Sequence, residues 1–215
     1  MCICLSYGEA LARHADPADK APKHIFGIVP NFRTFGSSEE NKPVTPKEKF
    51  TAAENSFGRG TVALGALFGG QAMLAKSTPS YGYGVSGSAK YVAASYADFV
   101  IGNYMTEAVF PTLFHQDPRY FRRATGAAWS RLGSAAGQIF WTRSDSGHKQ
   151  FNFSEMAGAS AGVDISNAYY SDNRNAADAA TRLGVQIGLD IVGNLLKEFS
   201  PELNKLFSRK HTAIP

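Results

Sequence analysis

The chain has 215 residues, of which 44% are hydrophobic and 19% are charged. This balance excludes an intrinsically disordered chain, and the length is enough for one domain with a buried core plus appendages. The formal net charge is only +4, and no nucleic-acid recognition module is visible, so nucleic acid is not an expected partner.

The first twelve residues read MCICLSYGEALA and end in an A-x-A triplet, which is typical of a signal-peptide cleavage site. Their apolar part is short and lacks a basic start. We therefore interpret residues 1–12 as the remnant of an export signal, with an ordinary cytoplasmic N-terminus as the alternative. Cys2 and Cys4 are the only cysteines, and their spacing favours neither a disulfide nor a metal site.

Residues 13–50 are expected to form an extended polar arm, because five prolines are spread through them. Within this arm, HIFGIVPNF is the piece expected to lie on the body of the protein. Helical character begins at TPKEKF. There Thr45 suits the N-cap, Pro46 the first helical position and Glu48 the N3 position, which together are a helix-start signature.

The predicted fold class is all-α, a compact multi-helix bundle forming a single helical domain over residues 51–209, followed by a tail at 210–215. Candidate helices span 46–76, with an interruption near Gly58 and Gly60, and 88–114, 127–141, 154–169, 175–199 and 201–208. LGVQIGLDI (183–191) alternates as a strand would, but its apolar pattern continues at helical spacing to Phe199, which favours a helix. No segment reaches about 18 uninterrupted apolar residues, so no spanning transmembrane helix is expected.

Small residues recur four positions apart in four of the predicted helices. The G-x-x-x-G pairs are Gly65/Gly69, Gly133/Gly137, Gly158/Gly162 and Gly184/Gly188. Each pair makes a smooth groove that another helix can approach closely. An interior Gly costs about 1 kcal/mol relative to Ala, so tight packing is expected to compensate. The spacing leaves open packing within the chain, between copies in a homo-oligomer or against lipid.

GASAG (158–162) matches the G-x-S-x-G nucleophile elbow, with Ser160 at its centre. Asp190 and His211 follow in the order expected of an α/β-hydrolase. That motif needs a strand, a sharp turn and a helix, and the preceding sequence lacks β-branched runs. A small-residue helix face is therefore the favoured interpretation, and a small hydrolase or other enzyme using Ser160 or helix carboxylates is the alternative function.

Carboxylates occur on three of the apolar helices. They are Asp98, Glu107, Glu155, Asp164 and Asp190. A di-metal centre in a helical bundle would also use Glu-x-x-His pairs, which the five histidines do not supply. We therefore expect no metal and no other cofactor, and interpret these groups as helix caps or partners of arginines.

The segment FPTLFHQDPRYFRRATG (110–126) is the most distinctive of the sequence. Asp117 and Pro118 suit the start of a helix, with helical residues expected from Arg119. Arginines flanked by aromatic residues suit phosphate or carboxylate recognition, and internal ion pairs are the alternative. The predicted anion-binding arginines of this arginine-rich turn and the residues after it are Arg119, Arg122, Arg123, Arg131 and Arg143.

The motifs GIVPNFRTF, TPKEKF, YADFVIGNYMTEAVFPTLFHQDPRYFRR, RSDSG, FNFSE and LKEFSPEL together resemble an uncharacterised family of bacterial proteins, over residues 27–207. The resemblance implies no activity and no catalytic residue. It implies export, because members of that family usually carry export signals. The expectation is a non-enzymatic protein of the cell envelope or periplasm that contacts anionic lipid or an acidic protein partner through the arginine-rich turn.

Overall fold

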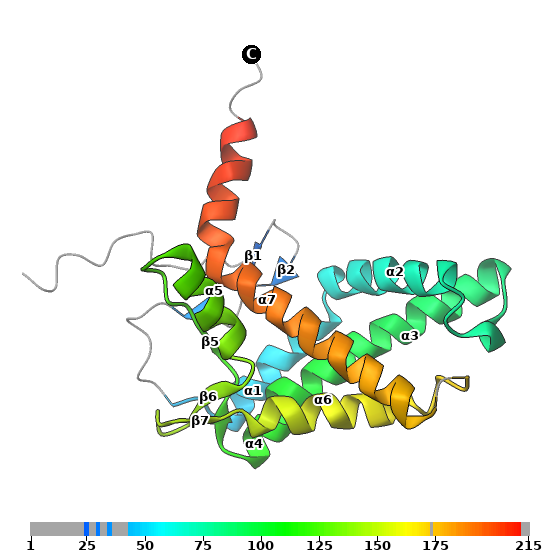
Figure 1. The fold of residues 1–215 in the computed structure, drawn as a ribbon, viewed down its shortest axis with the longest axis horizontal. Coiled ribbons are helices and arrows are strands. Elements are labelled where there is room, and N and C mark those ends of the chain that lie inside the picture. The colour runs from blue at the N-terminus through cyan, green and yellow to red at the C-terminus, as the bar shows by residue number, and fades with distance from the viewer. Residues whose placement is uncertain (1–23, 26–28, 31–33, 36–42, 173, 212–215) are drawn as a thin grey trace, which may run out of the picture.

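The computed structural model describes residues 24–25, 29–30, 34–35, 43–172 and 174–211, and within these residues the protein is mostly helical, as predicted (Figure 1). The signal remnant predicted at residues 1–12 and most of the predicted arm lie outside the described residues. The elements in chain order are β1 (His24–Ile25), β2 (Val29–Pro30), β3 (Thr34–Phe35), α1 (Pro46–Glu54), η3 (Asn55–Phe57), α2 (Arg59–Leu74), η4 (Pro79–Tyr81), α3 (Gly84–Tyr104), the π-helix η5 (Met105–Val109), α4 (Phe110–Leu113), β4 (Gln116–Asp117), β5 (Tyr120–Phe121), α5 (Ala128–Gly137), β6 (Trp141–Ser144), β7 (Lys149–Phe151), α6 (Phe153–Ser166) and α7 (Ala176–His211).

Helix α1 begins where its cap residues predict. The Glu48 backbone N–H donates to the Thr45 hydroxyl at 3.3 Å, and the Thr45 backbone N–H donates to the Glu48 carboxylate at 2.9 Å. Lys49, in the next turn, is buried. Its ammonium donates to both carboxylate oxygens of Asp145, at 2.8 and 2.9 Å, and to the Pro111 carbonyl at 3.1 Å. Helix α1 is thereby tied to α4 and to the β6–β7 hairpin.

Helices α2 and α3 form a hairpin that extends to one end of the molecule (Figure 1). Glycine allows their close approach, because a Cβ at Gly69 would lie 2.7 Å from the Tyr91 carbonyl oxygen and from Val92 Cα. A Cβ at Gly65 would lie 2.9 Å from Tyr96 Cβ. On α6, a Cβ at Gly158 would meet the η5 backbone at the same distance. A Cβ added at Gly133, Gly137, Gly184 or Gly188 would meet no atom within 4 Å among the described residues.

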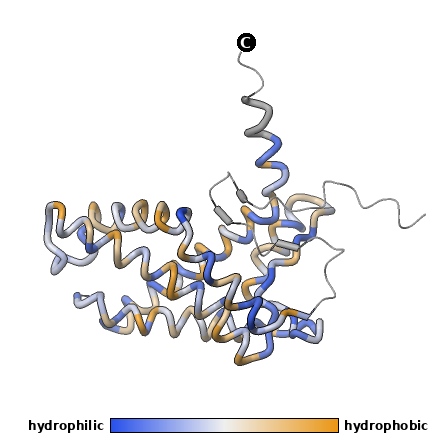
Figure 2. The backbone as a smooth tube through the Cα atoms, turned by 180° about the vertical axis from the view of Figure 1, so that it is seen from behind, coloured by the Kyte–Doolittle hydropathy of each residue, from blue (hydrophilic) through white to orange (hydrophobic). Residues whose placement is uncertain are grey.

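The face of α2 that points away from α3 is exposed and apolar. Leu67 and Leu74 lie on it, and Figure 2 shows mainly hydrophobic and neutral residues along this helix. Within the described residues, no helix combines the length and hydrophobicity needed to cross a membrane.

The helix predicted over 88–114 begins earlier, at Gly84, and changes type before its end. Its hydrogen bonding widens at η5, a π-helix over Met105–Val109, before a last turn forms α4. π-Helical segments are rare and frequently occur at functional sites. This one packs against α1 and α6 near the centre of the molecule.

The helix predicted from Arg119 is wrong. The Arg119 backbone N–H does donate to the Asp117 carboxylate at 2.9 Å, as at a helix cap. The chain then extends as β5, which pairs in parallel with β3 and buries Tyr120. Strands β4, β6 and β7 form a separate antiparallel sheet, in which β6 lies between β4 and β7. The helix predicted over 127–141 ends at Gly137, because the chain from Trp141 enters this sheet.

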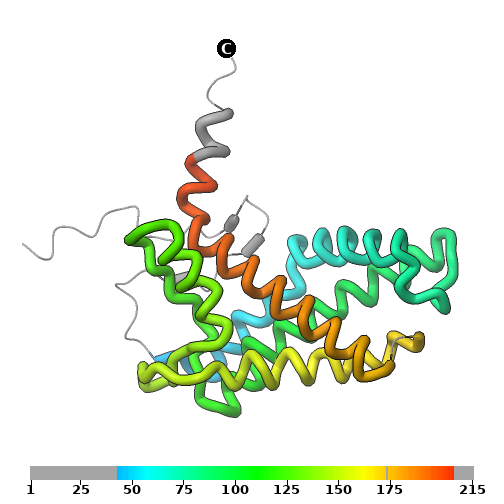
Figure 3. The backbone as a smooth tube through the Cα atoms, viewed as in Figure 1, coloured from blue at the N-terminus to red at the C-terminus, as the bar shows by residue number. Residues whose placement is uncertain are grey.

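Helix α7 joins two predicted helices into one. It runs from Ala176 to His211 and confirms the helical interpretation of 183–191, but it continues through Pro201. Proline has no N–H for the carbonyl four residues earlier, that of Lys197. The Ser200 hydroxyl donates to this carbonyl at 3.0 Å and replaces the lost bond. Figure 3 shows α7 crossing the molecule, with its C-terminal turns projecting beyond the body.

The core combines small apolar side chains with buried polar ones. Its buried hydrophobic residues are Ala53, Tyr91, Ala94, Ala108, Tyr120, Ala135, Ile139 and Ala159. Lys49, Gln116 and Glu198 are among the largest fully buried side chains. Because a buried polar group must be hydrogen-bonded to avoid a large desolvation cost, specific polar contacts hold the elements in place as much as apolar packing does.

Candidate functional site

Two of the five predicted anion-binding arginines contact internal carboxylates. Arg119 donates to Asp117 from Nε at 2.9 Å and from Nη2 at 2.6 Å. Arg131 donates from Nε to Glu198 at 2.8 Å and from Nη1 to Glu202 at 2.7 Å. For these two arginines the structure shows the internal ion pairs that the sequence left as the alternative.

Glu198 is the centre of this ion-pair cluster and is fully buried. Its carboxylate accepts the Arg131 bond and one from the Tyr120 hydroxyl at 2.8 Å. It also accepts from the backbone N–H groups of Arg123 at 3.0 Å and Ala124 at 3.2 Å. Burial, with the adjacent Glu198 carboxylate, raises the pKa of Tyr120 well above its usual value. The cluster fastens α7 to α5 and to the arginine-rich turn.

The other three arginines of the set lie close by. Arg122 is half-buried, and Arg123, whose side chain is exposed, donates its backbone N–H to Glu198. The Arg143 guanidinium lies 4.5 Å from the centre of the Phe121 ring, and that of Arg119 lies 5.6 Å from the same ring. Arg119 and Arg143 thus share one ring, whereas Arg131 bonds Glu198 and Glu202.

A continuous row of aromatic rings runs over the neighbouring surface, and we call it the aromatic ladder. Its members, in order of contact, are Phe110, Phe114, Phe153, Phe151 and Trp141, with successive ring centres 5.8, 6.4, 5.1 and 6.1 Å apart. Phe110 comes from α4, Phe114 directly follows this helix, and the other three come from α6, β7 and β6. Three are about half exposed: Phe153 is 54% exposed, Trp141 52% and Phe114 41%.

Cations lie beside the ladder on the β6–β7 hairpin. Trp141 is opposite Phe151, and Arg143 is opposite Lys149. Because alternate residues of a strand share a face, these two aromatic and two cationic side chains lie on the same side of the hairpin. The Lys149 ammonium is 5.7 Å from the Trp141 ring centre. Thr142 belongs to the opposite side.

Sequence reasoning missed the ladder because its members come from separate segments. The available signal was the alternation in WTRS and KQF on either side of the turn DSGH, which is the pattern of a two-sided hairpin.

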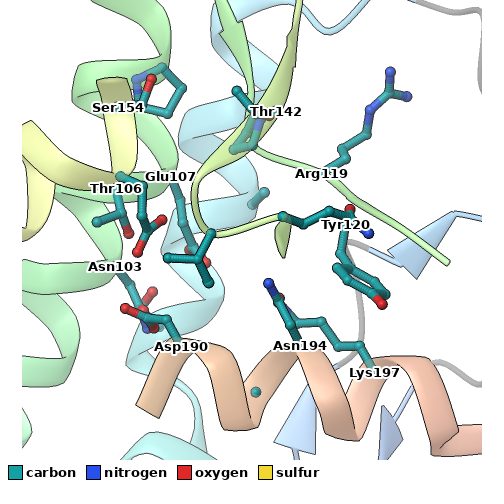
Figure 4. A pocket seen from close by; sticks show the side chains of 18 of the residues that line it. Asn103, Thr106, Glu107, Arg119, Tyr120, Thr142, Ser154, Asp190, Asn194 and Lys197 are labelled. Atoms are coloured by element: carbon teal, nitrogen blue, oxygen red, sulfur yellow. The ribbon is translucent and has the colours of Figure 1, made fainter. Parts of the chain in front are cut away.

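On the other side of the hairpin, a polar cavity of about 220 Å³ lies where α1, η3, α2, α3, η5, α6 and α7 meet the β4–β6 segment (Figure 4). Asp190, Asn194 and Lys197 of α7 line it from one side. Facing them are residues of α3, η5, α6 and the strands, which include Asn103, Thr106, Glu107, Tyr120, Thr142, Ser154 and Glu155. Three of the five helix carboxylates named from the sequence thus converge on one cavity.

The other two helix carboxylates lie apart from this cavity. Asp164 is exposed, and Asp98 lines a separate cavity. In the described part of the chain, no group of three or more His, Cys, Asp or Glu side chains could hold a metal ion.

Buried hydrogen bonds hold the cavity wall in place. The Gln116 side-chain carbonyl accepts from the Ser154 backbone N–H at 2.7 Å and from the Ser154 hydroxyl at 2.5 Å. Its amide donates to the Phe151 carbonyl at 2.7 Å. The Thr142 hydroxyl donates to the Asp117 carbonyl at 2.7 Å. The cavity and the aromatic ladder therefore share the hairpin as a common wall.

A second cavity, of about 520 Å³, lies between α2, α3, α6 and α7. Its lining is mainly apolar and includes Phe68, Phe99 and Leu189. Asp98 lines it too, and its carboxylate accepts from the hydroxyls of Tyr169 at 2.5 Å and Tyr170 at 2.6 Å. Burial raises the pKa of all three groups.

The hydrolase motif does not have the surroundings that it needs. Ser160 lies inside α6, exposed, and its hydroxyl donates to the Met156 carbonyl one turn back at 2.8 Å. A nucleophile elbow requires a strand-to-helix turn, and this serine is in regular helix. Asp190 lies on α7, where it accepts from the Gln186 amide at 3.1 Å. His211 ends α7, and its side chain lies outside the described part.

No family model, no curated protein and no solved structure matches this chain.

Proposed function

We propose that this chain is a non-enzymatic helical protein of the cell envelope that attaches to an anionic membrane surface. The observation that carries the proposal is the half-exposed aromatic ladder beside the hairpin cations. Trp is enriched at the boundary between lipid and water, Phe and Trp form the apolar face of segments that lie at that boundary, and lysine and arginine are attracted to anionic headgroups. A location in the envelope is supported by the A-x-A triplet at residues 10–12.

The geometry moves the proposed contact from the arginine-rich turn to the hairpin. Arg119 and Arg131 already bond internal carboxylates, so the cost of extracting them opposes their use at a lipid surface. Lys149 faces Arg143 across the two strands and is exposed. Its ammonium can therefore meet an anionic headgroup at the surface beside the ladder.

The rest of the fold supplies a rigid support for this surface. We propose that the small-residue positions Gly65, Gly69 and Gly158 act as intrachain packing faces, since each meets a neighbouring helix without room for a Cβ. Attachment through the ladder does not require a whole helix to enter the bilayer, because half-exposed rings at the protein surface reach only the headgroup boundary.

The proposal is tested by co-sedimentation with vesicles of phosphatidylcholine, with and without phosphatidylglycerol. The double variant Trp141→Ala/Phe153→Ala should weaken binding to the anionic vesicles about thirtyfold, because each of the two half-exposed rings contributes about 1 kcal/mol of burial. Lys149→Glu should remove the preference for phosphatidylglycerol. High salt should weaken wild-type binding, since it screens charges at the surface.

Tyr83→Ala is the matched control. Tyr83 is an aromatic residue that is 71% exposed, but it lies at the start of α3, outside the ladder, and its loss should leave binding unchanged. The proposal is wrong if the ladder variant, shown to be folded by circular dichroism, sediments with anionic vesicles as wild type does.

A further inference from the structure

We infer that the polar cavity is a binding site for a small hydroxylated amine. This ligand site goes beyond membrane attachment, because the cavity lies on the side of the hairpin opposite the cations. Three properties of the lining carry the inference: a buried hydroxyl that lacks a protein partner, an excess of carboxylates, and a high density of hydrogen-bonding groups.

The hydroxyl belongs to Ser56, in the turn between α1 and α2. Ser56 is only 4% exposed and lines the cavity. Among the described residues, its Oγ has no hydrogen-bond partner. Buried hydroxyls are nearly always hydrogen-bonded, and leaving one unsatisfied is unfavourable. A polar ligand in the cavity would supply the partner.

The charge of the lining indicates the charge of the ligand. Asp117 and Arg119 also line the cavity, but they bond each other. The lining also carries the carboxylates of Glu107, Glu155 and Asp190 and the ammonium of Lys197, so its carboxylates outnumber its cations. With carboxylates in excess, a cation is favoured over a neutral or anionic molecule, because opposite charges at short range attract most strongly away from bulk water. An ammonium group carries three donors for such oxygens.

Size and hydrogen bonding define the rest of the ligand. A volume of about 220 Å³ corresponds to about seven waters, so the ligand is small. Apart from the carboxylates, the lining offers the Ser56 hydroxyl, the Asn103 amide and the amide oxygen of Asn194. Such a wall favours a molecule with several hydroxyl groups over an apolar amine, because an apolar body would give the buried Ser56 hydroxyl no partner.

Isothermal titration calorimetry with three probes of the same size tests the inference. Glucosamine, glucose and glucuronate present an ammonium, a hydroxyl and a carboxylate on the same sugar ring. Titrated near pH 6, where amines are protonated and carboxylates ionised, glucosamine should bind with a Kd of about 1 mM or tighter. Glucose should bind at least about tenfold more weakly, and glucuronate should not bind.

Three isosteric or small substitutions locate the site. Glu107→Gln and Asp190→Asn should each weaken glucosamine binding about tenfold, as expected for loss of one charge-assisted hydrogen bond. Ser56→Ala should weaken it severalfold. Asp164→Asn is the control, because Asp164 is exposed on α6 and outside the cavity, and it should bind as wild type does.

Three results would each overturn the inference. The first is absence of glucosamine binding at millimolar concentrations, and the second is equal binding of all three probes. The third is glucosamine binding that none of the cavity substitutions changes, although circular dichroism shows the variants to be folded. The titration uses no vesicles, so its outcome is independent of membrane attachment.

Discussion

At the scale of single residues, Asp98 shows how burial competes with hydrogen bonding. Two tyrosine hydroxyls donate to its oxygens, from Tyr169 at 2.5 Å and from Tyr170 at 2.6 Å. These bonds and the charge of Arg182 act to lower its pKa, but the loss of hydration outweighs them and the pKa of Asp98 is raised. The folded protein therefore holds the Asp98 proton more tightly than the unfolded chain does.

This shift predicts how stability changes with pH. The stabilising effect of a raised carboxyl pKa is complete below the unfolded value of about 3.9 and is lost as pH rises through the folded value. The free energy of unfolding of wild type, relative to Asp98→Asn, should fall as pH rises from about 4. Urea titrations of both proteins at a series of pH values measure this difference, and a difference that is constant with pH would contradict the assignment.

At the scale of elements, two adjacent glycines of α2 differ in their surroundings. A Cβ at Gly69 would lie 2.7 Å from the backbone of α3, whereas one at Gly70 would meet nothing within 4 Å. Gly69→Ala should lower the free energy of unfolding by about 1–3 kcal/mol, because the helices must separate. Gly70→Ala should raise it by up to about 1 kcal/mol, through helix propensity. Thermal or urea unfolding of the pair measures both, and equal effects would argue against close α2–α3 packing.

The helices could be predicted because their start signals are local. The Thr45 capping box lies within four residues, and the apolar periodicity of α7 lies within a single continuous segment, so neither signal depends on a distant partner. The strands could not, since each has only two to four residues and depends on a distant partner. The Asp117 cap chemistry fits a helix or a turn equally well. The extended chain that follows it brings Tyr120 to Glu198, 78 residues away.

For the candidate sites too, the sequence predicted the charged residues but not the contacts between distant segments. The sequence identified the arginines and the helix carboxylates as the charged groups to follow. It could not show that Arg131 pairs with Glu198, because no local spacing links them, nor that Ser56 lies beside Glu107 and Asp190 in one cavity. The only sequence signal for the role of Glu198 was that this acidic residue stands next to the apolar positions of α7.

At the scale of the whole molecule, Glu198 joins three parts of the fold. Glu198→Ala should lower the free energy of unfolding by about 3–5 kcal/mol, because it leaves the buried Arg131 charge and several N–H and O–H donors without their acceptor. Glu202 also bonds Arg131 but is 49% exposed. The change Glu202→Ala should therefore lower the free energy of unfolding by no more than about 1 kcal/mol. Urea unfolding compares the two. Similar losses for both would show that the buried cluster does not dominate.

Arg131 and Glu198 are far apart along the chain, so they are synthesised at different times. Glu198 follows Arg131 by 67 residues, and at about 5–20 residues per second their synthesis is separated by about 3–13 s. During that interval the emerging α5 has no carboxylate from α7 to neutralise Arg131, and Tyr120 has no buried acceptor. A ribosome-bound chain that stops before residue 198 should therefore hold α5 and the arginine-rich turn undocked and open to protease. The cluster can form and the domain can close only after Glu198 has been synthesised and has emerged from the ribosome.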